Sequence, residues 1–230
     1  MKIVVISDVH GRDLWKKQVE EEADLYIFLG DYFDSFDIPH EIQISNFLDI
    51  KKFYEDNKDK VILLAGNHCL SYITSNCACS GFNYTFYHAI NHILRPMYLN
   101  GDLKACKVID NYLFVHAGVS KTWCDLYDVD LDNLEESIND LFKREIFAFC
   151  FQHSYFKTID DVNYRYRSDS YGENFWQSPL WIRPNSLLES KIDNYIQVVG
   201  HTAHEKHTFK DGVWFTDTQE FINEPLILEI

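Results

Sequence analysis

The sequence predicts an α/β protein with a mixed, four-layer α/β/β/α arrangement of helices and sheets. Short apolar runs rich in Val, Ile and Leu alternate with longer stretches of helical periodicity, which is typical of the α/β class. Several of the apolar runs end in polar residues, as expected for buried strands that lead into loops at one edge of a sheet. A hairpin pattern and a last short strand near the C-terminus add antiparallel pieces, which favours mixed sheets over a purely parallel one.

The expected strands are short apolar runs bounded by turn residues or polar groups. Asp110-Asn111 and Asp211-Gly212 are turn pairs, so each divides its apolar segment into two antiparallel strands. In chain order, strands are expected at residues 3–7, 25–29, 61–65, 108–115, 195–199, 208–216 and 226–230.

Helices are expected where apolar residues recur at intervals of three or four positions. Leu14, Trp15 and Val19 have this spacing and mark the buried face of the first helix. In chain order, the expected helices cover residues 13–23, 40–57 and 134–149.

Length and composition fit one domain that covers residues 1–230. With 46% hydrophobic and 16% aromatic residues, the chain has enough apolar material for a real core, which argues against a disordered protein. Residues 132–190 are the least regular part, and we expect them to form a cap or insertion beside the functional site rather than a second domain.

The net charge of −15 narrows the classes of partner. An acidic surface repels nucleic-acid phosphates at long range, so non-specific nucleic-acid binding is not expected. Bound divalent metals would invert the local field, so phosphorylated substrates remain possible. The N-terminus lacks the features of a secretory signal and no apolar run approaches about 18 residues, so we expect a cytoplasmic protein without a membrane segment.

The cysteines of a cytoplasmic protein are expected to be reduced thiols. Cys77-Ala-Cys79 resembles a metal or redox pair, but a structural zinc site would need a second such pair. The expectation of free thiols covers Cys69, Cys77, Cys79, Cys106, Cys124 and Cys150.

Residues of the types that bind metals follow five of the expected strands. They are Asp8 with His10, then Asp31, Asn67, His116 and His201. Ligands bind at the carboxyl ends of strands in α/β sheets, so we expect these side chains to converge on one rim. A single His after a strand is more often a hydrogen-bonded loop residue. The ordered set, with glycine beside several members, is what predicts a metal site.

The predicted ligands combine carboxylate oxygen, amide oxygen and imidazole nitrogen. This mixture suits Mn first, with Fe, Zn, Ni or Co as alternatives, and it lacks the thiolates of a structural zinc site. A carboxylate such as Asp31 can bridge two ions. Two metals about 3.5–4 Å apart clamp a phosphate and stabilise an in-line displacement.

Five motifs stand in order between residues 8 and 202. They are Asp8-Val9-His10, Gly30-Asp31-Tyr32-Phe33-Asp34, Gly66-Asn67-His68, Val115-His116-Ala117-Gly118 and Gly200-His201-Thr202. This set resembles the metallophosphoesterase (calcineurin-like) superfamily. The first motif, with Gly11-Arg12 after it, is similar to small phage and bacterial members that resemble phosphoprotein phosphatases.

The resemblance implies a phosphoesterase in which metal-bound hydroxide attacks phosphorus directly and no phosphoenzyme forms. His68 would donate a proton to the leaving group, and Asp34 would orient it. This agrees with the chemistry of the residues, because a carboxylate partner raises the pKa of a histidine toward the range of a general acid. The implied ligands are Asp8, His10 and Asp31 for the first metal, and Asp31, Asn67, His116 and His201 for the second.

One departure from the family pattern concerns phosphate binding. Ser35-Phe36 stands where the Ser/Thr phosphatases often have Arg-Gly. Arg183 and Arg12 are therefore the candidates to contact the phosphate in its place.

Two further departures concern the metal motifs. Cys69 follows the Gly-Asn-His motif where Asp or Glu is normal, which leaves a weaker hydrogen-bonding group beside the site. Many phosphodiesterase members end in Gly-His-x-His, but here Ala203 takes the place of the last histidine. His204 is displaced by one position and is not assigned as a ligand, which favours the phosphoprotein-phosphatase branch.

The leading prediction is hydrolysis of phosphomonoesters, on a phosphoprotein or a phosphorylated small molecule such as a nucleotide. Residues 178–184 resemble a segment of dinucleoside tetraphosphate hydrolases, so a phosphodiesterase or a hydrolase of that kind is the alternative. A non-catalytic scaffold that keeps the fold is the alternative from another class. The aromatic residues of 164–181 either belong to the core or cap, or form a wall that stacks on the substrate.

Overall fold

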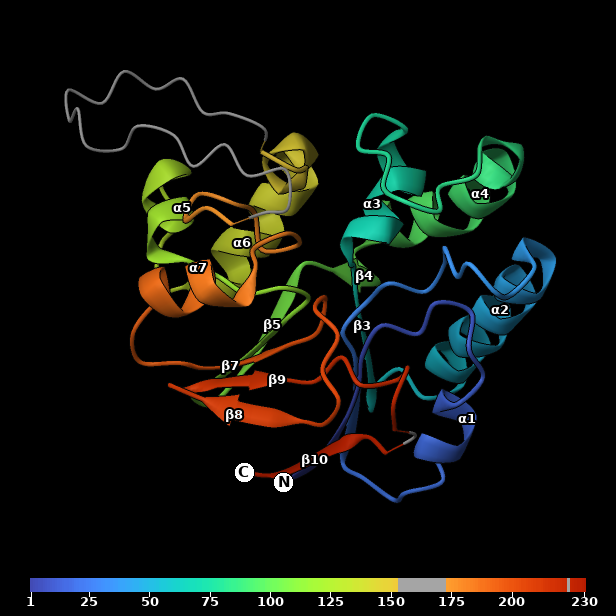
Figure 1. The fold of residues 1–230 in the computed structure, drawn as a ribbon, viewed down its shortest axis with the longest axis horizontal. Coiled ribbons are helices and arrows are strands. Elements are labelled where there is room, and N and C mark those ends of the chain that lie inside the picture. The colour runs from blue at the N-terminus through green and yellow to red at the C-terminus, as the bar shows by residue number, and fades with distance from the viewer. Residues whose placement is uncertain (153–172, 223) are drawn as a thin grey trace.

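The computed structural model describes residues 1–152, 173–222 and 224–230, and its two mixed sheets with helices outside them confirm the predicted fold class (Figure 1). The first sheet has the order β10-β1-β2-β3-β4. Its strands are parallel except β10, which pairs antiparallel with β1. The strands are β1 (Lys2–Ile6), β2 (Leu25–Phe28), β3 (Val61–Leu64), β4 (Leu103–Lys104) and β10 (Leu226–Glu229).

The second sheet has the order β5-β6-β7-β9-β8. Its three central strands are parallel, and both edge strands are antiparallel to their neighbours. Both predicted turns are confirmed, because Asp110, Asp211 and Gly212 have positive φ angles of 51°, 49° and 82°. The strands are β5 (Cys106–Ile109), β6 (Tyr112–Val115), β7 (Ile196–Val199), β8 (Thr208–Lys210) and β9 (Val213–Phe215).

The central strand β1 has both faces buried, and this places the two sheets against each other. Ile3 and Val5 pack in a cluster that includes Phe114 of the second sheet, whereas Val4 and Ile6 pack in the cluster that the helices cover. Successive side chains of a strand point to opposite faces, so one continuous apolar run supplies both layers. Each such side chain contributes about 1.5–3 kcal/mol when it is fully buried.

The helices lie on the outer faces of the two sheets (Figure 1). Contacts join α1, α2 and α4 to strands of the first sheet, and α6 to β5 of the second. They are α1 (Trp15–Gln18), α2 (His40–Asp56), α3 (Asn67–Thr74), α4 (Tyr84–Asn100), α5 (Lys121–Leu126), α6 (Leu134–Arg144), the 3₁₀ helix η1 (Ile146–Phe149) and α7 (Pro184–Ser190). No helix in the described part of the chain combines the length and the apolar character needed to cross a bilayer.

Two predicted helices are wrong in extent, and four helices, α3, α4, α5 and α7, are not predicted. The helix expected at 13–23 ends at Gln18, because Glu20, Glu21 and Glu22 would put three negative charges at the negative end of its dipole. The helix expected at 134–149 divides at Glu145, whose φ of −142° is not helical. The pattern does not predict α4, which has a proline inside it.

The described residues of the predicted cap share the core of the rest of the chain. Leu141, Phe149 and Leu187 lie in the same apolar cluster as Phe47 of α2. The remaining part, residues 153–172, lies outside the described residues.

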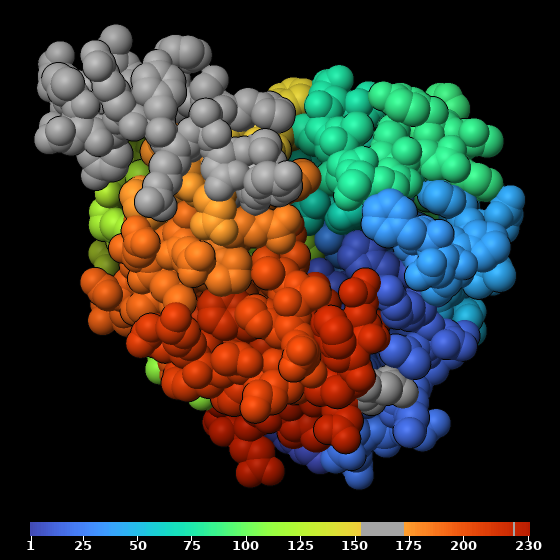
Figure 2. All heavy atoms as spheres, in the orientation of Figure 1, coloured from blue at the N-terminus to red at the C-terminus, as the bar shows by residue number. Residues whose placement is uncertain are grey.

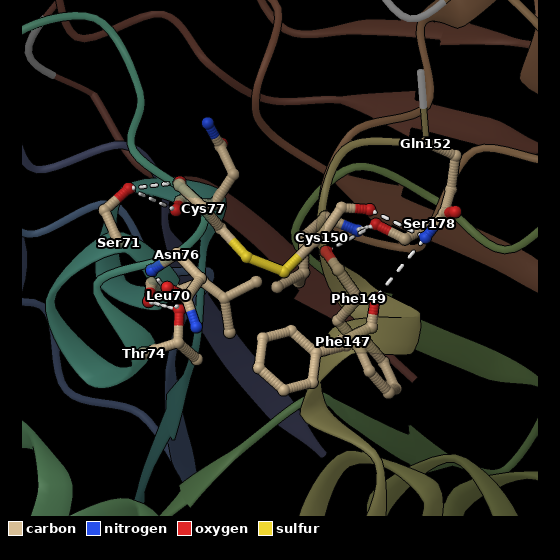
Figure 3. The surroundings of a disulfide bond; sticks show 12 residues. Leu70, Ser71, Thr74, Asn76, Cys77, Phe147, Phe149, Cys150, Gln152 and Ser178 are labelled. Atoms are coloured by element: carbon tan, nitrogen blue, oxygen red, sulfur yellow. Dashed lines mark hydrogen bonds between the residues drawn. A yellow bond between two sulfur atoms is a disulfide. The ribbon is translucent and has the colours of Figure 1, made fainter. Parts of the chain in front are cut away.

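A disulfide joins Cys77 to Cys150, so the prediction of reduced thiols is wrong for this pair (Figure 3). Cys77 follows α3 and Cys150 follows η1, and the fold brings their Cα atoms to 5.7 Å, which suits a disulfide. The two positions are separated by 73 residues, so no local sequence pattern indicates their contact. Four other cysteines, Cys69, Cys79, Cys106 and Cys124, are free.

Candidate active site

Loops at the carboxyl ends of parallel strands bring the predicted ligands together. Asp8, Asp31 and Asn67 follow β1, β2 and β3 of the first sheet, and His116 and His201 follow β6 and β7 of the second. Asn67 joins the two sheets, because its Oδ1 lies 2.9 Å from His116 Nε2 and 3.0 Å from His201 Nδ1. The predicted convergence of strand ends therefore produces one cluster at the rim of the sandwich.

Five residues of this region have left-handed backbone conformations although none is glycine. The φ angles are 48° for Asp8, 44° for His10, 51° for Asp31, 69° for Asp34 and 65° for His201. Such a conformation costs about 1–3 kcal/mol per residue, and it persists where the surrounding structure enforces it. Strain of this kind gathers at functional sites, so its position here is independent support for one.

The Asp31 carboxylate lies at the centre of the cluster and is buried. Its Oδ2 is 3.2 Å from His116 Nε2 and 3.9 Å from the Nε2 atoms of His10 and His68. Its Oδ1 accepts the backbone N–H of His68 at 2.9 Å. Burial raises the pKa of Asp31, but the imidazoles, with His116 foremost, outweigh burial and hold it below its ordinary value. One carboxylate therefore faces histidines from both sheets.

Two of the histidines are oriented as metal ligands are. His10 Nδ1 lies 2.6 Å from the carbonyl oxygen of Phe33, and His116 Nδ1 lies 2.9 Å from that of Leu29, so both Nδ1 atoms donate. Nε2 of each ring then faces Asp31, and its lone pair is free for a cation when the ring is neutral. Metal-binding histidines donate their other ring nitrogen in this way, which fixes the tautomer.

The atoms that face the centre of the cluster include several acceptors, which suit a bound cation better than hydrogen bonds to one another. His116 Nε2 lies between Asp31 Oδ2 and Asn67 Oδ1, which are both acceptors. Burial opposes a charge on His116, yet Asp31 raises its pKa to about 9, so without a metal a proton takes the position of the cation. His201 Nε2 is buried without a partner among the described residues. The donor set therefore fits divalent metal ions.

Two groups of side chains could each hold an ion, and they share Asp31. In each group, one nitrogen or oxygen atom from every residue lies within 4.8 Å of the others. The groups are His10, Asp31 and His68, and Asp31, His116 and His201.

Asp8 is buried beside these groups but belongs to neither. Its two carboxylate oxygens are 3.0 and 3.1 Å from the backbone nitrogen of His201, whose N–H they accept. Burial, and then the charge of Asp217, raises the pKa of Asp8 well above its usual range. Two buried carboxylates close together repel each other, and a bound cation would relieve this repulsion.

Asp217 is a residue of the site that the sequence analysis missed. Burial raises its pKa to about 6, with the charge of Asp31 adding to the effect. It follows β9, so the strand-end rule used for the other ligands could have identified it.

His68 and Asp34 form the pair that the resemblance implied. His68 Nδ1 lies 2.9 Å from Asp34 Oδ2, and the other ring nitrogen faces Asp31. Burial lowers the pKa of His68, but the charges of Asp31 and Asp34 outweigh burial and raise it. The pair can therefore hold a proton on Nε2 at the edge of the cluster.

The two predicted phosphate contacts differ in position. Arg183 Nη1 donates to Thr202 Oγ1 at 3.0 Å and to the carbonyl oxygen of His201 at 3.3 Å, so its guanidinium lies beside the cluster. Arg12 lies farther out and forms an ion pair of 3.3 Å with the exposed Glu220. Arg183 is the better placed of the two.

The remaining sequence candidates lie around the site. Cys69 is fully buried, and burial raises its pKa to about 12, so the thiol stays protonated. His204 packs on Phe215 and is in neither group of potential ligands among the described residues. The Trp181 ring lies 5.9 Å from that of His201. The predicted aromatic wall covers residues 164–181, and its part from 164 to 172 lies outside the described residues.

Glycine is required where two loops pass close to the buried carboxylates. A Cβ atom on Gly66 would lie 2.0 Å from Asp31 Oδ1, and one on Gly200 would lie 2.0 Å from Asp8 Oδ2. Both distances are well inside van der Waals contact, so any side chain would displace the carboxylate.

We expect Gly66→Ala to lower the phosphoesterase activity that the sequence resemblance implies by at least about 100-fold, because a shift of about 1 Å in a catalytic group costs this much. The measurement is kcat/KM with an aryl phosphate, and circular dichroism would check the fold. Activity within a factor of three of the wild type would show that Asp31 does not need its present position.

Three solved structures with a similar fold are named as phosphatases. The cold-active protein-tyrosine phosphatase of the psychrophile Shewanella sp. has a TM-score of 0.59 and 20% sequence identity, over 99% of this chain and 75% of that one. A point mutant of a cold-active protein tyrosine phosphatase has a TM-score of 0.57 and 20% sequence identity, over 94% of this chain and 71% of that one. A protein serine/threonine phosphatase from Saccharomyces cerevisiae has a TM-score of 0.54 and 14% sequence identity, over 94% of this chain and 66% of that one. At these identities the likeness establishes the fold alone.

No curated protein sequence matches the chain. The family profile described as calcineurin-like phosphoesterase matches residues 1–205, which include all five motifs. The chain therefore belongs to the calcineurin-like phosphoesterase family and is a metal-dependent phosphoric ester hydrolase.

Proposed function

We propose that this enzyme is a two-metal phosphomonoesterase. The observation that carries the proposal is the Asp31 carboxylate, which both groups of potential ligands share. A shared carboxylate is the usual bridge between two ions. The proposed ligands follow the family motifs: Asp8, His10 and Asp31 for the first ion, and Asp31, Asn67, His116 and His201 for the second. His68 of the first group is reserved for proton transfer because Asp34 binds its other ring nitrogen.

The protein's own residues have distinct roles in this proposal. When bound, two divalent cations, with manganese expected first, would neutralise the phosphoryl oxygens and provide the nucleophile from water. Arg183 would hold a phosphate oxygen beside His201. His68 would give its Nε2 proton to the leaving oxygen, because Asp34 holds the other ring nitrogen.

We propose a phosphoprotein as the substrate in preference to a nucleotide. A groove of about 990 Å³ begins at Gly11 and Arg12, directly after a proposed ligand, and continues along the start of α2 past Ile38 and Ile42. The C-terminal segment that contributes Gln219 to its lining lies against the N-terminal segment (Figure 2). An open groove of this size suits an extended chain. The solved neighbours, named as protein-tyrosine and protein serine/threonine phosphatases, support the same choice.

A dinucleoside tetraphosphate hydrolase is the second candidate, and one observation favours it. The Trp181 ring lies beside His201, where a nucleotide base could stack on it. Assays of the manganese-loaded enzyme with a phosphopeptide, a bis-aryl phosphate and a dinucleoside tetraphosphate separate the candidates. Cleavage of the tetraphosphate alone would replace the first proposal with the second.

The test of the mechanism is His68→Ala with two phosphomonoesters. An alkyl phosphate has a poor leaving group and needs protonation, so we expect its kcat to fall by about 10²–10⁴-fold. The leaving group of p-nitrophenyl phosphate is p-nitrophenolate, an anion that is stable without a proton, so the kcat for this substrate should fall much less. Metal content, measured by mass spectrometry, should stay at two ions per chain in the variant. Equal losses on both substrates would remove His68 from the role of general acid.

A further inference from the structure

The buried carboxylate of Asp34 binds two residues on one face of α3. Its Oδ2 is 2.9 Å from His68 Nδ1, and its Oδ1 accepts the hydroxyl of Tyr72 at 2.5 Å. His68 and Tyr72 are four residues apart in α3, so their side chains lie over adjacent turns of the same face. The two oxygens of one carboxylate are thus divided between the proposed general acid and a tyrosine.

We propose that Tyr72 is a positioning residue for the reaction, which fixes the Asp34 carboxylate so that it aligns the imidazole of His68 with the leaving group. The inference rests on the proposed role of His68 as general acid. A carboxylate with only one partner can rotate and offer either oxygen to it. The Tyr72 hydroxyl occupies Oδ1 and leaves Oδ2 for His68.

Tyr72 is held firmly enough to perform this role. Its ring is fully buried and packs on Phe33 and Phe82, with centroid distances of 5.7 and 4.8 Å. The hydroxyl oxygen also accepts the backbone N–H of Asn83 at 3.2 Å. Burial and the neighbouring Asp34 raise the pKa of Tyr72, so the hydroxyl keeps its proton and remains a donor.

The other polar group near Asp34 Oδ1 does not replace Tyr72. His40 Nε2 lies 3.8 Å from Asp34 Oδ1, which is too far for a hydrogen bond. This nitrogen has no hydrogen-bond partner among the described residues. The His40 ring is stacked on Phe86 at 4.9 Å, which holds it in place. The Tyr72 hydroxyl is therefore the donor that determines the orientation of Asp34 at this oxygen.

The experiment measures how Tyr72→Phe changes the dependence of kcat on the leaving group. With the manganese-loaded full chain, we expect kcat for an alkyl phosphate to fall about 10-fold, the low end for loss of an outer partner of a catalytic group. KM should not change, and p-nitrophenyl phosphate should keep its rate within about twofold. His68→Ala provides the upper limit of the effect.

Tyr98→Phe is the matched control. Its hydroxyl is also hydrogen-bonded in the interior, at 2.9 Å to the carbonyl oxygen of Phe142, but far along the chain from the acid pair. A merely structural effect would lower the rates of both substrates equally in either variant. In the Asp34→Asn background, Tyr72→Phe should cause no further change in the leaving-group dependence, because the group that it positions has gone.

The outcomes separate this inference from the proposed function. If His68→Ala shows the leaving-group dependence and Tyr72→Phe behaves like Tyr98→Phe, the role of Tyr72 is overturned and the general acid remains. If His68→Ala lacks the dependence, both fail. A second measurement does not need activity: the NMR signal of the His68 Nδ1 proton should move in Tyr72→Phe and stay in Tyr98→Phe, and an unmoved signal in both contradicts the inference.

Discussion

Asp31→Asn is expected to lower kcat/KM by at least about 10³-fold, because the loss of several kcal/mol of charge stabilisation has this effect on a rate. The substitution keeps the shape of the side chain and removes only its charge. In the wild-type protein this charge lies within 3.9 Å of ring nitrogens of His10, His68 and His116. The variant would present an uncharged amide there, and two cations would lose their common anion.

Metal content distinguishes this explanation from a general loss of structure. We expect the wild type to bind two manganese ions per chain and Asp31→Asn to bind one or none, as measured by titration calorimetry. Asp110→Asn is the matched control, because Asp110 has the same φ of 51° and lies in the β5–β6 turn outside the site. Two ions and activity within 10-fold of the wild type in Asp31→Asn would contradict the proposed bridge.

The elements that the sequence predicts well are those whose pattern is local. β1 is a continuous apolar run, and the Asp110 and Asp211 turns have residues that accept a left-handed backbone. The convergence of Asp8, Asp31 and Asn67 also follows from the sequence, because they follow the neighbouring parallel strands β1, β2 and β3, whose carboxyl ends share an edge. The packing of the second sheet against the first brings His116 to them. The rule that ligands lie at the carboxyl ends of strands therefore predicts most residues of the site.

The parts that the sequence does not predict depend on contacts between distant residues. Tyr72 has the ordinary appearance of a buried aromatic residue in a helix, and only the fold places its hydroxyl on Asp34. Asp217 follows the short strand β9, but no glycine stands beside it as beside Asp31 and His201, so its signal in the sequence is weaker than theirs. The left-handed backbone of Asp8 or His201 is imposed by the surrounding loops rather than by residue type.

The Cys77–Cys150 disulfide is the contact that sequence reasoning had wrong, and its reduction is expected to lower the free energy of unfolding by about 4 kcal/mol. The cross-link closes a loop of 73 residues, and in the chain-entropy description a loop of this length loses about that much freedom in the unfolded state. The disulfide also ties the segment after α3 to the segment after η1, and α3 carries Asn67 and His68 (Figure 3). Reduction should therefore loosen the helix that supplies two of the proposed active-site residues.

Urea unfolding of the oxidised and reduced protein, followed by circular dichroism, measures this difference. The unfolded oxidised chain should have four reactive thiols, from the free cysteines, and reduction should raise the number to six. The double variant Cys77→Ala/Cys150→Ala is the control, since its unfolding midpoint should not respond to reductant. Because Cys79 lies two residues from Cys77 and is free, Cys79→Ser would prevent disulfide exchange during the measurement. Equal midpoints for the oxidised and reduced wild type would mean that the fold does not depend on this bond.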